Sequence, residues 1–337
     1  MISRLAGALA LNASVLLSQG VCAEKVPSQE RVSFYFAAHE DDWQLFMNPS
    51  AFADVADPKT KTVFVHITAG DAGGGIGTGG RKHPYYLARE NGAEVAIRFM
   101  ADSGNQPADK AASRIEFNGH RIYRVSYRNT ATYFLRLPDG NPSGTGYPGT
   151  GYQSLERLAK SEISSFSAID GSTVYRGWAD LVATLRAVVD HERANARSVQ
   201  LNVAESNTSI NPGDHSDHRM TTKAALEAAR DLACARRVHY VEYASARLPE
   251  NLASQQRDME SSVLAVTAAG ILALDHTSIW HPYHRSYLGR NYFRVEEGAG
   301  DCNGPVSSAA HTVAGQPIKP LMKSIADPGT PADARPR

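Results

Sequence analysis

The chain has 337 residues, 42% of them hydrophobic and 21% charged, and its 35 Lys and Arg residues equal its 35 Asp and Glu residues in number. A net charge of zero gives no electrostatic reason to expect binding to nucleic acid or to an anionic membrane surface. The length suits one large α/β domain, and the sequence shows no internal repeat and no linker that would force two domains.

The first 23 residues predict a secretory signal peptide. Arg4 supplies the positive charge, Leu5 to Leu17 is mostly apolar, and Val21-Cys22-Ala23 is a cleavage site of small residues. The apolar stretch is too short to span a bilayer as an anchor. We therefore expect cleavage near Ala23 and export, either to the periplasm or as a secreted protein, with no transmembrane segment in the mature chain.

A cluster of polar residues follows the first predicted strand. Residues 31–37 form an apolar run typical of a strand buried on both faces, and a helix is predicted from Gln44. Between them lies His39-Glu40-Asp41-Asp42, with one imidazole and three carboxylates. Such a junction lies at the carboxyl edge of a sheet, where α/β folds bind ligands. This much charge beside a buried strand is costly unless a cation offsets it, so the cluster indicates a metal site.

A second strand is predicted over residues 60–68, followed by a glycine-rich loop over 69–81. Gly75 to Gly80 formally matches the GxGxxG pattern of dinucleotide-binding proteins. However, six residues separate the strand from Gly75, and Lys82-His83-Pro84 intervenes before the next helix. We interpret the segment as a flexible loop that borders a substrate cleft.

The middle of the chain predicts a helix and then a β-rich segment. The helix covers residues 85–100, with Ala93 and Ile97 on its inner face, and Gly92 weakens it locally. Residues 103–175 alternate as strands do and include a turn-rich loop over 139–152. We interpret 103–175 as a β-rich insertion that covers or extends the binding cleft.

A second polar cluster follows a later strand. A helix over 178–189 and a strand over 198–204 precede Asp214-His215-Ser216-Asp217-His218, and another helix is predicted from Met220. In a parallel sheet, both polar clusters would lie at the same edge. Histidine and carboxylate ligands with an open coordination position are the composition of a catalytic zinc site.

The rest of the chain predicts a strand over 238–244 and a helix over 251–274 that Gly270 could break. His281 and His284 form either a rival metal pair or part of an aromatic cleft wall. Pro282 between them breaks the helix that HxxH ligands often use, which favours the wall.

Two further features concern the exported chain. The mature protein keeps Cys234 and Cys302, and a single disulfide or two free thiols both remain open. A tail over 327–337, rich in Pro, Ala, Asp and Arg, is expected to be disordered, so the folded domain would span residues 24–326.

The alternation of strands and helices predicts an α/β fold: a Rossmann-like, mostly parallel sheet flanked by helices, with the β-rich insertion. The two polar clusters resemble the motifs of the PIG-L/LmbE-like family of zinc-dependent N-deacetylases. The family usually has Ala-His-Pro-Asp-Asp-Glu at the first motif, whereas this chain has Glu40 in place of the proline and Trp43 in place of the final glutamate.

This resemblance implies the role of each site residue. It implies one Zn²⁺ per chain, held by His39, Asp42 and His218. It implies Asp41 as the general base, His215 as a donor to the oxyanion and Asp217 as the residue that orients His215 or His218. Arg89, at the start of the helix over 85–100, is implied to contact the substrate.

The function implied is that of an exported zinc-dependent hydrolase. It would remove an N-acetyl or related N-acyl group from an amino sugar, glycan or glycoconjugate. Taken singly, each of these residues is more typical of a helix cap, a core position or a surface turn, and only the two clusters together favour a metal site. Two other functions remain: a non-catalytic glycan- or metal-binding protein on the same fold, and a nucleotide-dependent oxidoreductase that rests only on Gly75 to Gly80.

Overall fold

The structure is a computed structural model that describes residues 30–105, 108–194 and 196–302. The predicted signal peptide over 1–23, its cleavage site at Ala23 and the predicted tail over 327–337 therefore lie outside the described residues. Within the described ranges, no helix is both long enough and apolar enough to cross a membrane.

The centre of the fold is an eight-stranded mixed sheet with the order β10-β9-β8-β1-β2-β5-β4-β3. The strands are β1 (Arg31–Ala37), β2 (Thr60–Thr68), β3 (Ala111–Phe117), β4 (His120–Tyr127), β5 (Thr130–Leu137), β8 (Ser198–Ala204), β9 (Arg236–Tyr240) and β10 (Phe293–Glu296). Strands β9, β8, β1, β2 and β5 run parallel, and the antiparallel strands β10 and β4–β3 complete the two edges. The predicted α/β fold class is confirmed.

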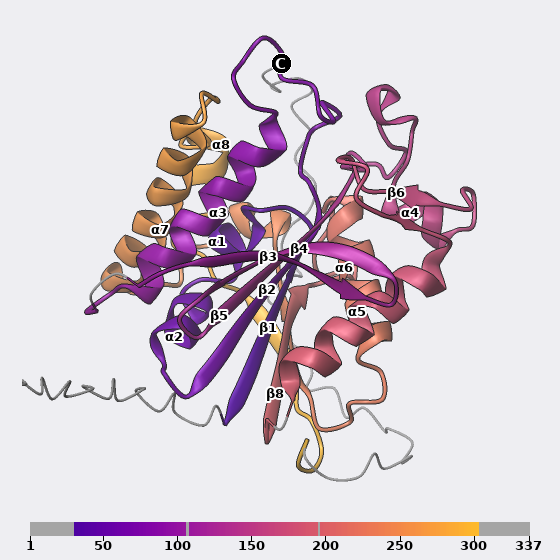
Figure 1. Ribbon diagram of the computed structural model, residues 1–337. Coiled ribbons are helices and arrows are strands. Elements are labelled where there is room, and N and C mark those ends of the chain that lie inside the picture. The colour runs from indigo at the N-terminus through magenta and orange to yellow at the C-terminus, as the bar shows by residue number, and fades with distance from the viewer. Residues whose placement is uncertain (1–29, 106–107, 195, 303–337) are drawn as a thin grey trace, which may run out of the picture.

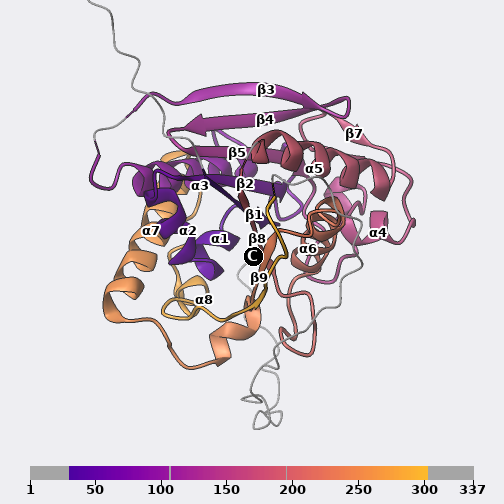
Figure 2. The same cartoon turned by 90° about the horizontal axis from the view of Figure 1, so that it is seen from below.

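Helices cover both faces of this sheet, as Figures 1 and 2 show. One face carries α4 (Leu155–Ala159), α5 (Trp178–Arg193) and α6 (Ser216–Ala228). The other carries α1 (Asp42–Phe46), α2 (Ser50–Ala56), α3 (Tyr85–Ala101), α7 (Ser254–Ala273) and α8 (Pro282–Arg285). Side chains of β1 alternate between the two cores: Phe34 and Phe36 pack with α5 and α6, and Tyr35 packs with α1 and α3. The central strands are therefore buried on both faces.

The β-rich segment within 103–175 contributes β3, β4 and β5 to the main sheet, where β5 pairs with β2. These strands lengthen the central sheet. A short separate pair, β6 (Phe166–Ser167) and β7 (Val174–Tyr175), follows α4. The loop between β5 and α4 returns to the site and packs against the glycine-rich loop: a Cβ on Gly73 would lie 2.6 Å from Cγ of Tyr147. Gly73 also has a φ of +79°, so this position requires glycine for two reasons.

Three predicted boundaries were wrong by a few residues. Helix α6 begins at Ser216, not near Met220, because the His215 side chain caps it by accepting a hydrogen bond from the Asp217 N–H (3.1 Å). Strand β9 ends at Tyr240, and residues after it form a 3₁₀ helix, η2 (Tyr243–Arg247). Helix α7 begins at Ser254 and continues unbroken through Gly270.

Gly92 and Gly270 face each other where α3 crosses α7. A Cβ added to Gly270 would lie 2.8 Å from Cα of Gly92, and a Cβ on Gly92 would lie 2.9 Å from the Thr267 carbonyl oxygen. The Asn91 side chain donates a hydrogen bond across the crossing to the Gly270 carbonyl (2.8 Å). These glycines thus allow close helix packing, which outweighs their low helix propensity.

We expect Gly270→Ala to destabilise the protein by about 1–3 kcal/mol, the usual cost of overpacking a close contact. The better helix propensity of alanine should not compensate for the contact with Gly92. Urea unfolding followed by circular dichroism measures this. Ser262→Ala, at an exposed position of the same helix, is the control and should stay within about 0.5 kcal/mol of the parent. Equal stability of the two variants would contradict the crossing argument.

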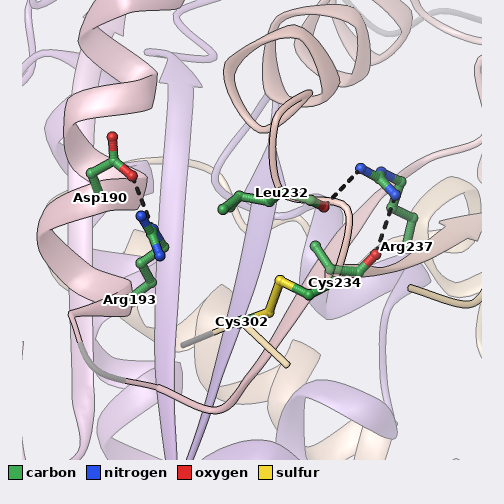
Figure 3. Close-up of a disulfide and its surroundings, with 7 residues drawn as sticks. Asp190, Arg193, Leu232, Cys234, Arg237 and Cys302 are labelled. Atoms are coloured by element: carbon green, nitrogen blue, oxygen red, sulfur yellow. Dashed lines mark hydrogen bonds and ion pairs between the residues drawn. A yellow bond between two sulfur atoms is a disulfide. The ribbon is translucent and has the colours of Figure 1, made fainter. Parts of the chain in front are cut away.

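Cys234 and Cys302 form a disulfide with their Cα atoms 5.2 Å apart, as Figure 3 shows. It ties the segment after β10 to the turn before β9. The Cys302 N–H also donates to the carbonyl of Arg197, the residue before β8 (3.1 Å). On the other side of this turn, the Arg237 guanidinium donates to the carbonyls of Ala235 and Leu232 (each 3.2 Å). Of the two alternatives left open by the sequence, the structure has the disulfide.

Since the bridge closes a loop of 68 residues, its removal should lower the free energy of unfolding by about 2–5 kcal/mol. The paired variant Cys234→Ser/Cys302→Ser should melt earlier than the parent, and reductant should shift the parent toward it. Mass spectrometry after alkylation, with and without reductant, checks the pairing independently. A parent protein that is fully alkylated without reductant would show that the bridge is not formed.

Candidate active site

The end of β1 places the first group of site residues. His39 and Asp42 are linked locally, because the His39 backbone N–H donates to Oδ2 of Asp42 (2.7 Å). This bond leaves Oδ1 of Asp42 facing the His39 ring, 3.4 Å from its Nδ1. Oδ2 of Asp42 therefore fixes the conformation of the loop, and Oδ1 is available to bind a metal ion.

The end of β8 and the first turn of α6 place the second group. Because β8 is the parallel neighbour of β1, its carboxyl end lies beside that of β1. The capped start of α6 brings His218 inward, with Nε2 3.2 Å from Nδ1 of His39 and 3.3 Å from Oδ1 of Asp42. The predicted metal ligands His39, Asp42 and His218 are therefore adjacent, although 179 residues separate the two histidines.

The spacing of these three atoms fits a tetrahedral cation. In a tetrahedral zinc site with bonds of about 2.0–2.2 Å, ligand atoms stand about 3.3–3.6 Å apart. The three distances here are 3.2, 3.3 and 3.4 Å, and all three side chains are buried. Two imidazole nitrogens and one carboxylate oxygen are also the ligand types of catalytic zinc sites. The residues thus fit a metal ion in donor type, number and spacing.

Buried carboxylates hold the far nitrogen of His218. Its Nδ1 lies 2.9 Å from Oδ1 of Asp214 and 2.5 Å from Oε2 of Glu242. An Nδ1–H hydrogen-bonded to Asp214, with the Glu242 carboxylate beside it, leaves the lone pair of Nε2 directed at Asp42 and His39. Carboxylate–histidine pairs of this kind orient ligands and raise their basicity in metal sites.

Asp217 lies nearer to His39 than to either histidine we predicted it to orient. Its Oδ2 is 3.6 Å from Nε2 of His39 and 3.8 Å from Nδ1 of His215, and it accepts a hydrogen bond from the Gly140 N–H (2.8 Å). Nε2 of His39 is buried and has no hydrogen-bond partner among the residues that the structure describes. The position of Asp217 therefore suits it to orient His39, because the α6 backbone already holds Nδ1 of His215.

The electrostatics of the site favour positive charge between the ligands. Burial opposes the charged form of His39 and of His218, but the surrounding carboxylates, of which Asp42 contributes most, together outweigh it and raise both histidine pKa values well above normal. Burial likewise opposes the charge of Asp42, and the two imidazoles outweigh it and lower its pKa well below normal. A cation at this point would meet the same attraction.

His215 presents an N–H to the cleft. Its Nδ1 accepts the capping hydrogen bond from Asp217, so in the neutral ring the proton is on Nε2. Burial and the charges of His39 and His218 lower the pKa of His215, which keeps the ring neutral. Its Nε2–H, 3.7 Å from Oδ1 of Asp139, is therefore a neutral donor at the edge of the metal position.

Asp41 and Arg89 form the opposite side of the cleft. Arg89 donates through Nη2 to Oδ1 of Asp41 and through Nε to Oε2 of Glu40 (3.0 Å). The other oxygen of Asp41 lies 3.6 Å from Nε2 of His284. Glu40, the residue that replaces the family's proline, is thus a buried partner of Arg89, and burial raises its pKa to about 8. The predicted contact between Arg89 and a substrate stays a prediction.

Trp43, the second departure from the family motif, is a core residue. Its indole N–H donates to Nε2 of His66 (3.2 Å), and its ring packs on Phe64 with centroids 4.7 Å apart. Burial lowers the pKa of His66 to about 4, so His66 accepts this bond as a neutral ring.

Other combinations of these residues also offer closely spaced ligand atoms. They are the group His39, His215 and His218; the group His39, Asp139, His215 and Asp217; and the group Asp214, His218 and Glu242. The last group meets at Nδ1 of His218, the nitrogen that faces away from Asp42. Because the same histidines occur in more than one group, measuring the metal content of the His215→Ala and His218→Ala variants is needed to identify the ligands.

The cleft above this cluster has a volume of about 160 Å³. Its lining combines the polar cluster with aromatic side chains from η2, α8 and the loop after β5. The lining residues are His39, Asp41, Asp42, Leu45, Phe46, Arg89, Asp139, Pro142, Tyr147, His215, Tyr243, Tyr283, His284 and Tyr287. His284 belongs to this wall, and the alternative that His281 and His284 are a rival metal pair has no support among the metal-ligand groups of the described residues.

Several residues of the site were not predicted from the sequence. Asp139, Glu242 and Tyr243 lie just beyond strand ends at the same edge of the sheet, which is a signal the sequence carries. Asp214 belongs to the second polar cluster, but no role was predicted for it. The approach of His284 to Asp41 had no such signal, because it depends on how the segment after α7 folds back over the site.

Comparisons with known proteins complete this description. No family model matches the chain, and no curated protein matches it. One similar solved structure is N,N'-diacetylchitobiose deacetylase from Pyrococcus horikoshii, with 14% identity and a TM-score of 0.43 over 79% of this chain and 83% of that chain. A second is the zinc-inhibited form of the teicoplanin deacetylase Orf2, with 12% identity and a TM-score of 0.37 over 73% of this chain and 87% of that chain. A third is the 4-carboxy-2-hydroxymuconate hydratase GalB from Pseudomonas putida KT2440, with 12% identity and a TM-score of 0.34 over 76% of this chain and 82% of that chain.

Two of these three are deacetylases, the class that the resemblance of the motifs implies. Because every TM-score is below 0.5, the function proposed below is derived from this chain's own residues.

If Asp214 orients His218 as a ligand, Asp214→Ala should weaken metal binding by about 10- to 100-fold. Glu242 would remain as the second partner of Nδ1, so binding should be weakened and not abolished. Competition with a chromophoric chelator measures the dissociation constant. Asp258→Ala, at an exposed acid on α7, is the control. Unchanged affinity in Asp214→Ala would show that Asp214 does not support His218 as a metal ligand.

Proposed function

We propose that this protein is an exported zinc-dependent hydrolase that removes an N-acetyl or related N-acyl group from an amino sugar, glycan or glycoconjugate. The observation that carries the proposal is the triangle of His39 Nδ1, Asp42 Oδ1 and His218 Nε2, which fits a tetrahedral ion. It lies at the floor of a cleft whose walls carry a carboxylate and an imidazole N–H that the ligand set does not use. The predicted signal peptide supports export.

His39, Asp42 and His218 would hold the metal and leave a coordination position open. A zinc ion bound there would lower the pKa of its water to about 7 and polarise the acyl oxygen. Asp41 is the candidate general base: its carboxylate lines the cleft beside Asp42, takes a proton from the attacking water and delivers it to the departing amine. Arg89 and His284 flank Asp41 and fix its orientation.

His215 would stabilise the charge that develops on the acyl oxygen. Its Nε2–H is a neutral donor held by the helix cap, so it needs no reorganisation during the reaction. Asp217 would orient His39, which is a positioning role and not a chemical one. The residues thus separate into ligands, a base, an oxyanion donor and the groups that orient them.

The alternatives predict different observations. A non-catalytic binding protein would need the metal ligands but not Asp41 as a chemical group. A nucleotide-dependent oxidoreductase would need the Gly75 to Gly80 loop to bind the nucleotide. The dinucleotide motif leads directly into a helix, whereas α3 begins only at Tyr85, with four residues between it and Gly80. Release of free amine from N-acetylated sugars without nucleotide, abolished by a chelator and restored by zinc, would separate all three.

The central test uses Asp41→Asn. Because Asp41 does not hold the metal, this variant should keep its zinc while kcat falls by about 10²- to 10⁴-fold, the usual contribution of general acid–base catalysis. The loss should appear in kcat more than in KM, since the proton transfer occurs on the way to the transition state. Metal content and steady-state rates on an N-acetylated sugar measure both effects. Asp41→Asn at the parental rate would exclude Asp41 as the base.

His215→Ala should also keep its metal, with kcat lowered about 10²- to 10³-fold by the loss of one oxyanion donor. His218→Ala is the matched comparison three residues away, and it should lose metal and activity together. If His215→Ala loses its zinc as well, the group of His39, His215 and His218 is the true ligand set. The same measurement therefore decides between the two arrangements.

A further inference from the structure

The two walls of the cleft differ in character. Arg89, Asp41 and Asp139 form a charged wall on the side of α3 and the loop after β5. The rest of the lining is mainly aromatic and includes Phe46, Tyr243, Tyr287 and Tyr283, which we call the aromatic wall. The charged and aromatic residues meet at His284, whose Nε2 lies 3.6 Å from Oδ2 of Asp41 and whose ring contacts Tyr283. A substrate that fills this cleft therefore meets both charged and aromatic groups.

The aromatic wall is continuous from the metal ligands to the surface. The Tyr243 ring packs edge-on against His218, with centroids 5.1 Å apart, and stacks with Tyr287 at 5.9 Å. Tyr283 then packs edge-on against Tyr287 at 5.6 Å. Tyr243 is partly buried, Tyr287 is 3% exposed and Tyr283 is 50% exposed. The outer end of the wall is an open aromatic surface.

Tyr283 is held in place although half of it is exposed. Besides Tyr287, its ring contacts His284 edge-on at 5.2 Å and stacks with His281 at 6.2 Å. His281 and His284 are hydrogen-bonded to each other through ring nitrogens (2.9 Å), so they form a fixed support. A large side chain ordered by neighbours binds with a small loss of conformational entropy, as tyrosines at recognition sites do.

The charge of the cleft excludes one class of substrate. Among its lining residues in the described part of the chain, Arg89 is the only lysine or arginine, and its guanidinium is bonded to both Glu40 and Asp41. A phosphate group needs a free guanidinium or ammonium group. The carboxylates of Asp41 and Asp139 would also repel an anion at this wall. An uncharged substrate fits better.

We propose that Tyr283 forms a subsite for a second, uncharged sugar ring, linked to the N-acyl sugar at the metal. This inference rests on the proposed function and narrows its substrate class to neutral saccharides of two or more rings. A pyranose has an apolar C–H face that packs on an aromatic ring and hydroxyl groups at its edge. The Tyr283 ring supplies the face, and Nδ1 of His281, the ring nitrogen that does not take part in the bond to His284, is a polar group beside it.

The kinetic test compares three probes: N-acetylglucosamine, its β-1,4-linked disaccharide and N-acetylglucosamine 1-phosphate. The parent should prefer the disaccharide to the monosaccharide by about tenfold in kcat/KM, which corresponds to one aromatic contact, and the 1-phosphate should be the poorest substrate. Tyr283→Ala should reduce the disaccharide preference to about one, and Tyr283→Phe should keep it. Tyr152→Ala, which removes an equally exposed tyrosine (52%) outside this cleft, should leave the preference unchanged.

A binding test is independent of deacetylation. Saturation-transfer NMR with the β-1,4-linked disaccharide of glucose, which has no N-acyl group, should show contact in the parent and in Tyr152→Ala but not in Tyr283→Ala. If the parent hydrolyses none of the three probes but still binds this saccharide through Tyr283, the proposed reaction is wrong and the subsite stands. If the 1-phosphate is the best substrate, or Tyr283→Ala keeps the disaccharide preference, the subsite is wrong.

Discussion

Parallel pairing of β1 with β8 is the constraint on which the site depends. The pairing runs from Arg31 opposite Ser198 to Tyr35 opposite Asn202, and it fixes both strand ends at one edge of the sheet. His39 follows one strand and His218 follows the other, so their ring nitrogens come within 3.2 Å. A parallel pair of this kind is buried on both faces. The polar side chains inside it are hydrogen-bonded, as Asn202 is to Ser33 (3.0 Å), and the charged residues of the site follow the strand ends. The buried core and the charged site are thus consequences of the same arrangement.

The site concentrates carboxylates that would be costly without positive charge nearby. Asp42, Asp214, Asp217 and Glu242 are all buried around His39 and His218. The charged forms of the histidines and of Asp42 stabilise one another against burial, and a divalent cation would act in the same direction. Arg89 offsets Asp41 and Glu40 on the other side. The site therefore has two separate charged groups. One is the cation position among His39, Asp42 and His218, and the other is Arg89 with its carboxylate partners.

Much of this arrangement was predictable from the sequence, because strand ends followed by His and Asp are local patterns. The strands at 31–37, 60–68 and 198–204 match β1, β2 and β8, and both polar clusters lie where an α/β fold places them. Gly92 and Gly270 were misjudged as weak points, since their use depends on a helix crossing between distant segments. The bond between Glu40 and Arg89, and the approach of His284 to Asp41, likewise depend on tertiary packing that no local pattern reports.

The most direct test of the central claim is X-ray absorption at the zinc edge of the purified protein. The account predicts a first shell of nitrogen and oxygen only, at about 2.0–2.1 Å, with outer-shell scattering from two imidazoles. Sulfur is not expected, because Cys234 and Cys302 are joined to each other. A shell with three imidazoles or a sulfur ligand, or a folded and active protein that contains no metal, would contradict the assignment of His39, Asp42 and His218.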